Sequence, residues 1–93
     1  MTITLTYHGH AALGLDIGGT HVLVDPYFRD NPAAAADPAE LPADYILVSH
    51  GHGDHVGDAV EIAKRTGAII IANFEVANWF SAQGVENVHP QHI

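Results

Sequence analysis

The sequence predicts an α/β fold of four strands followed by two helix–strand units, and three observations support this prediction. Three stretches near the N-terminus alternate apolar with other residues, which is typical of strands that bury one face. A continuous apolar run then leads into a segment of helical periodicity, and this strand-then-helix order occurs twice. The 93 residues suffice for one small domain, residues 1–93, and are too few for two.

The first strand is expected over Thr2–Tyr7, where Thr alternates with Ile3, Leu5 and Tyr7. These three side chains should therefore share one buried face. A β-hairpin is expected next, because two further alternating stretches flank Gly18–Gly19, which supplies a tight turn. The three strands then run up, down and up, so the ends of the first and third strands should lie at the same edge of the sheet.

The middle of the chain is expected to be a loop, since residues 26–42 hold four of the five prolines and show no period. The run Tyr45–Val48 is continuously apolar and β-branched, the pattern of a strand covered on both faces. An amphipathic helix should follow, because apolar residues recur with helical spacing from Val56 to Ala63. Gly67 stands where the C-cap of this helix belongs.

The last third of the chain repeats the strand-then-helix order. Residues 68–72 form another apolar run, and Asn73 is placed to cap a short second helix. Gly84 should end that helix, and extended structure should resume over residues 85–88.

The composition is acidic and rich in histidine. Eleven acidic residues against three Lys and Arg give a formal charge of −8, which repels nucleic-acid phosphates and anionic lipids. We therefore expect neither nucleic acid nor membrane as a partner. The sequence shows no long apolar run or secretory signal, and a cytoplasmic location is expected. Eight His and no Cys point to metal bound by imidazole and carboxylate.

Histidine is concentrated directly after the run Tyr45–Val48. In an extended segment, residues two apart project the same way, so His50 and His52 can bind one ion. The intervening glycines let the chain bend, which allows Asp54 and His55 to turn toward the same pocket. Polar loop residues without a ligand are the alternative, but three imidazoles and a carboxylate this close need a cation or shared protons.

The motif His-x-His-x-Asp-His resembles the signature of the metallo-beta-lactamase superfamily of metal-dependent hydrolases. The flanking segments are similar to its branch of uncharacterised metal-dependent hydrolases related to the ascorbate-phosphate lactonases. Those segments are Tyr7-His8-Gly9-His10-Ala11, Leu23-Val24-Asp25-Pro26, Tyr45-Ile46-Leu47-Val48-Ser49-His50 and His89-Pro90. The resemblance implies an α/β fold that is the N-terminal half of an αββα metallo-beta-lactamase-like sandwich, because members are normally about twice this length or more.

By this resemblance, His50 and His52 hold one metal ion and Asp54 and His55 hold a second, while Asp25 braces the ligand loop from behind. A catalytic zinc takes three protein ligands, so two ions need about six, and the motif offers four. The chain is therefore expected to be an incomplete or split domain. It should need a C-terminal complementary chain or assemble as a homo-oligomer.

His8 and His10 repeat the two-residue spacing and should lie at the sheet edge shared with Asp25. They are candidates to contact the metal or the substrate, and the alternative is that they are turn residues bonded to the backbone. Asp25 is a candidate to accept a hydrogen bond from a ligand imidazole, which would fix its tautomer. The alternative for Asp25 is a turn-forming role before Pro26.

The expected function is hydrolysis of a small-molecule ester, lactone or phosphoester by a metal-bound hydroxide, with Asp54 as the catalytic residue that orients or deprotonates the water. The expected cofactor is zinc, as one or two ions, and nickel, manganese or iron also suit this donor set. The alternatives are a phosphodiesterase or nuclease of the same superfamily, and an inactive metal-binding assembly fragment. The isolated 93 residues could themselves be inactive, because the ligand set is incomplete.

Overall fold

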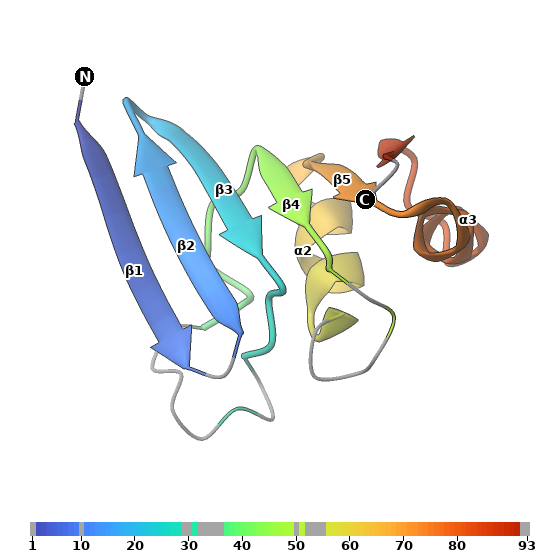
Figure 1. Ribbon diagram of the computed structural model, residues 1–93, viewed down its shortest axis with the longest axis horizontal. Helices are drawn as coiled ribbons and strands as arrows, with labels where there is room; N and C mark the ends of the chain where they lie inside the picture. Colours follow the sequence, from blue (N-terminus) through green and yellow to red (C-terminus); the bar gives the residue numbers. More distant parts are fainter. Residues whose placement is uncertain are drawn as a thin grey trace.

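A computed structural model of the chain describes residues 2–9, 11–28, 31, 37–49, 51 and 56–91. Within these residues, one six-stranded sheet has the order β1-β2-β3-β4-β5-β6 (Figure 1). The elements in chain order are β1 Ile3–Gly9, β2 Ala12–Ile17, β3 Thr20–Val24, β4 Tyr45–Leu47, α2 Ala59–Thr66, β5 Ile69–Ala72, α3 Phe74–Ala82 and β6 Val88–Pro90. β1, β2 and β3 pair antiparallel, and β3 to β6 pair parallel. The predicted α/β order is confirmed.

The two helices connect parallel strands, and each has a terminus that the sequence predicts. α2 ends at Gly67, which adopts a left-handed conformation with φ of 74° and donates its N–H to the carbonyl of Ala63. α3 begins after Asn73, whose side chain accepts a hydrogen bond from the N–H of Val76 at 2.9 Å. In the part of the chain that the structure describes, no helix has the length and apolar character needed to cross a membrane.

The core lies between the sheet and the two helices. Ile46 and Ile70 from neighbouring strands are fully buried, and so are Ile62 from α2 and Phe80 from α3. Figure 1 shows α2 behind β4 and β5. Burying side chains of this size stabilises the fold by about 1.5–3 kcal/mol each. Tight packing therefore fixes the parallel half of the sheet.

The opposite face of the sheet is apolar and uncovered by the described residues, and we call it the open face. Strand alternation and cross-strand pairing place on it Ile3, Leu5, Tyr7, Leu13, Leu15, Ile17, Val22, Val24, Tyr45, Leu47, Ile69 and Ile71. The expectation that the alternating residues of the first strand are buried is wrong for this chain. Ile3, Leu5 and Tyr7 are 62–66% exposed, because the helices cover only the other face.

Two further expectations need correction for related reasons. β4 is not covered on both faces: Ile46 is buried, whereas Tyr45 on the open face is 39% exposed. The extended segment expected over residues 85–88 is shorter and shifted, since β6 spans Val88–Pro90. Val85 instead packs in the core, and its N–H donates to the carbonyl of Phe80 at the end of α3.

Candidate metal centre

The predicted ligand loop, residues 50–55, connects the end of β4 to the start of the α2 region. His50, His52, Asp54 and His55 lie outside the described residues, as does His10, so their ligand roles stay predictions. Among the residues that the structure does describe, no group of three or more His, Asp or Glu is placed to hold a metal ion. The residues on either side of the loop are described, and their contacts show how its two ends are held.

Asp25 holds the N-terminal flank of the ligand loop. It follows β3, and because β3 and β4 are parallel, with Val24 paired to Leu47, it lies beside the end of β4. Its buried carboxylate, 3% exposed, accepts two hydrogen bonds from Ser49, one from the backbone N–H and one from the hydroxyl, both at 2.6 Å. The residue directly before His50 is thus tied to Asp25 at two points.

The backbone of Asp25 is also fixed. Its N–H donates to the carbonyl of Leu47, and its own carbonyl accepts from the N–H of Tyr27, both at 2.8 Å. Asp25 has a φ of 46°, the one positive value among the described residues other than glycine. A non-glycine residue in this region is uncommon, and such outliers persist where surrounding contacts over-determine them. These contacts agree with a bracing role for Asp25, whereas its contact with a ligand imidazole stays a prediction.

His8 lies at the expected sheet edge, but its surroundings indicate packing. Its ring meets the ring of Phe28 edge to face, with centroids 4.9 Å apart. Burial lowers the pKa of His8 below its usual value, because the charged imidazolium loses solvent there. Neutral imidazole is therefore favoured, and nothing in the described contacts joins His8 to another candidate ligand.

Sequence reasoning missed Ser49 and Asn31 as parts of this edge. The buried side-chain amide of Asn31 donates to the carbonyls of His8, Gly9 and Tyr27 at 3.0–3.2 Å. It thereby fastens the end of β1 to the segment that follows β3. The dipeptide Asn31-Pro32 signals a turn, and no local pattern signals a bridge to β1.

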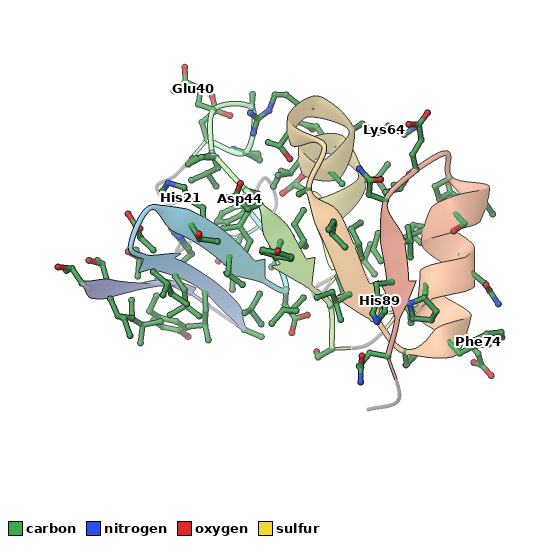
Figure 2. The ribbon with its side chains drawn as sticks, turned by 90° about the horizontal axis from the view of Figure 1, so that it is seen from above. His21, Glu40, Asp44, Lys64, Phe74 and His89 are labelled. Atoms are coloured by element: carbon green, nitrogen blue, oxygen red, sulfur yellow. The ribbon has the colours of Figure 1, made fainter. Side chains whose placement is uncertain are left out.

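Of the other described histidines, His21 lies at the opposite end of the strands, whereas His89 lies at the same end as Asp25 but on β6, level with Ile71 of β5 and Leu47 of β4. His21 is at the start of β3, where its N–H donates to a carboxylate oxygen of Asp44 at 2.8 Å. Figure 2 shows these two residues together and His89 on β6, with β4 and β5 between β3 and β6. His21 therefore lies away from the ligand loop, and a variant at this position is a suitable control for variants of the loop histidines.

A small apolar pocket adjoins the ligand loop on the side of α3. It has a volume of about 200 Å³ and is lined by Gly51, Val56, Glu75, Val76 and Trp79. Trp79 is 45% exposed, whereas the neighbouring Phe80 is buried in the core. The pocket places an aromatic ring close to the chain segment that carries the predicted ligands.

Comparison with known proteins identifies the family. The family model for the metallo-beta-lactamase superfamily matches residues 9–91, which include the ligand loop, Asp25 and both helices. The chain belongs to the metallo-beta-lactamase superfamily. The recognition from the motif and its flanking segments is confirmed.

Curated relatives within the superfamily are considerably longer than this chain. The UPF0173 metal-dependent hydrolase of Methanopyrus kandleri is 52% identical over 89 residues, and that of Shouchella clausii is 47% identical over 89 residues. Each match covers 96% of this chain and 39% of the relative. The chain thus spans about two fifths of the length of these relatives, in agreement with a missing complementary region.

Solved structures also share the fold of this chain, and the chain covers only part of each of them. Igni18, a metallo hydrolase from Ignicoccus hospitalis, superposes with a TM-score of 0.86 at 29% identity, covering 98% of this chain and 40% of that one. CmlA, a diiron β-hydroxylase from Streptomyces venezuelae, superposes with a TM-score of 0.74 at 23% identity, covering 95% of this chain and 20% of that one. The second likeness concerns the fold alone.

Proposed function

We propose that this chain is the ligand-loop part of a metal-dependent hydrolase, with His50, His52, Asp54 and His55 binding divalent metal. The observation that carries the proposal is the pair of hydrogen bonds from Ser49 to buried Asp25, which fixes the chain directly before the first ligand. Superfamily membership and the names of the relatives support the same activity.

The donor set fits a divalent ion. Three imidazoles and one carboxylate suit zinc, which we propose as one or two ions, and they also suit nickel, manganese and iron. The loop leaves the C-terminal end of parallel β4, which is the edge where open α/β sheets bind their ligands. When bound, the metal would lower the pKa of a water molecule toward about 7.

The chain's own residues would divide the remaining work. Asp54 would orient the water or accept its proton, and Asp25 would hold the start of the loop through Ser49. His8 and His10 are proposed to lie next to the substrate or a ligand, although the packing of His8 on Phe28 favours a supporting position. An uncharged His8 at this edge would add no positive charge.

The proposed substrate is a small-molecule ester, lactone or phosphoester. A phosphodiesterase or nuclease activity is less consistent with the chain, because the formal charge of −8 and only three Lys and Arg repel a phosphate backbone. An inactive metal-binding assembly fragment is the other alternative. We propose a C-terminal complementary chain or a homo-oligomer as the partner that covers the open face, and a cytoplasmic location.

Metal analysis of the untagged chain tests the binding step. The wild-type chain should retain at least one divalent ion after gel filtration, and the double variant His50→Ala, His52→Ala should lose it. His21→Ala is the matched control, since His21 lies at the start of β3, away from the loop. Equal metal content in the wild type and the double variant would contradict the proposal.

Hydrolysis assays test the catalytic step. The metal-loaded chain should turn over a model lactone or phosphodiester poorly, since the motif offers four of about six ligands. Adding the region of the Methanopyrus kandleri relative that this chain does not span should raise turnover, and Asp54→Asn should abolish that gain. Unchanged turnover on addition, with metal bound, would favour the inactive assembly fragment.

A further inference from the structure

Asp58 occupies an unusual position at the C-terminal flank of the ligand loop. It is the N-cap residue of α2, where an Asp side chain ordinarily accepts a hydrogen bond from the first turn of its own helix. Within the described helix it makes no such capping bond. Its Oδ2 instead accepts from the N–H of Phe28, 30 residues earlier in the chain, at 2.9 Å.

The backbone beside Asp58 makes a second connection to the same segment. The N–H of Asp58 donates to the carbonyl of Pro26 at 2.8 Å. Gly57 permits this approach: it has a φ of 48°, and a Cβ added there would lie 2.6 Å from the Cα of Tyr27. The chain after the ligand loop is thus pressed directly against residues 26–28.

The same four residues, Asp25 to Phe28, therefore hold both flanks of the ligand loop. Asp25 binds Ser49 before the loop, and the N–H of Phe28 and carbonyl of Pro26 bind Asp58 after it. We propose that Asp58 is a positioning residue that fixes the C-terminal flank of the ligand loop, as Asp25 fixes the N-terminal flank. This inference rests on the proposed metal-binding function of residues 50–55.

The physical reason is that a metal site needs its ligands held close to one geometry before the ion arrives. Productive sites hold their groups within about 0.5 Å, by contacts that lock the supporting residues. A loop fastened at one flank could place its first ligand while the last ones sampled many positions. Fastening Asp58 to the segment that already holds Ser49 fixes the separation of the two flanks.

The test compares Asp58→Ala, Asp58→Asn and Asp44→Ala. Asparagine keeps an oxygen that can accept from the N–H of Phe28, whereas alanine does not. Asp44 is the matched control, because its carboxylate also accepts one backbone N–H, that of His21 at 2.8 Å, at the opposite end of β3 and β4. Metal affinity, measured by competition with a chromophoric chelator, should fall about 10–100-fold in Asp58→Ala. It should stay near wild type in the other two variants.

Two further measurements make the outcome decisive. The visible spectrum of the cobalt-substituted chain should change in Asp58→Ala and not in Asp44→Ala, and a cooperative urea unfolding transition should show that both variants are folded. An equal fall in affinity in Asp58→Ala and Asp44→Ala, or no recovery in Asp58→Asn, would overturn the positioning role.

Amide hydrogen exchange of the metal-free chain separates this inference from the proposed function. Asp58→Ala should speed exchange at the N–H groups of Phe28 and Asp58, and Asp44→Ala should not. If the wild-type chain binds no metal, the proposed function fails, while exchange still reports on the connection. Unchanged exchange at both groups would overturn the inference by itself.

Discussion

Replacing Asp25 separates the geometric role of its side chain from its charge. Asp25→Ala removes the two acceptors that the buried Asp25 carboxylate offers to the N–H and hydroxyl of Ser49 at the end of β4. Hydrogen bonds to charged groups contribute about 1.5–3 kcal/mol each, so the free energy of unfolding should fall by about 3–6 kcal/mol. Natural domains are stable by about 5–15 kcal/mol, so this loss is a large part of the total.

Asp25→Asn should cost clearly less, for two structural reasons. Its amide oxygen can still accept from the N–H of Ser49, and the Ser49 hydroxyl can turn to accept from the new amide group. Asparagine also tolerates the positive φ at position 25 better than alanine does. Replacing charged by neutral hydrogen bonds should lower the free energy of unfolding by about 1–3 kcal/mol.

Urea unfolding followed by circular dichroism, with chelator present and protein at low micromolar concentration, measures both losses without metal binding. Asp37→Ala is a suitable control, because the Asp37 carboxylate accepts the N–H of Ala39 in an exposed turn. That change should cost no more than about 0.5 kcal/mol. Equal losses for Asp25→Ala and Asp25→Asn would refute the argument that the two hydrogen bonds to Ser49 stabilise this edge.

Three further predictions concern other parts of the chain. Because burial lowers the pKa of His8, the unfolded chain binds more protons between that pKa and about 6.5, so stability should fall as the pH drops through this window. His8→Gln should reduce that fall in chelator-treated protein, and an unchanged pH profile would contradict it. Sedimentation should show more than one chain per particle, because the open face exposes large apolar side chains. The double variant Leu5→Thr, Tyr7→Thr should reduce this association. A monomeric wild-type chain would argue against the open face as an interface. Phe80→Ala should lower the free energy of unfolding, measured in urea, by about 3–5 kcal/mol, because the Phe80 side chain is buried. Phe74 is 67% exposed, so Phe74→Ala should lower it by less than about 0.5 kcal/mol.

The sequence was sufficient for the order of elements because local patterns encode it. Alternation in the first strands, a Gly at the C-cap of α2 and an Asn at the N-cap of α3 each act within a few residues. The shared edge of β1 and β3 also followed from the short hairpin, since antiparallel neighbours reverse direction once per turn. The bracing role of Asp25 was expected from the resemblance to the superfamily, whereas its position at the end of a strand is visible in the sequence itself.

Which face of each strand is covered could not be predicted, because alternation reports an apolar face without reporting what packs on it. Ile3 and Leu5 alternate as buried residues do, yet they are exposed in this chain. The hydrogen bonds of Ser49 to Asp25 and of Phe28 to Asp58 could not be predicted from the sequence either. They join residues 24 and 30 positions apart, and their partners become neighbours only once β3 and β4 have paired.

The structure separates the part of the fold that fixes the ligand loop from the part that stays uncovered. The side-chain hydrogen bonds of Asp25 with Ser49 and of Asp58 with Phe28 hold the loop flanks, next to the core covered by α2 and α3. Two residues of the open face take part through their backbone, because the carbonyls of Leu47 and Ile71 accept from the N–H groups of Asp25 and Val48 within this chain. We therefore infer that the flanks are already in place before any partner covers the open face. A complementary region would then add ligands and bury apolar surface, while the geometry of the loop flanks would belong to this chain alone.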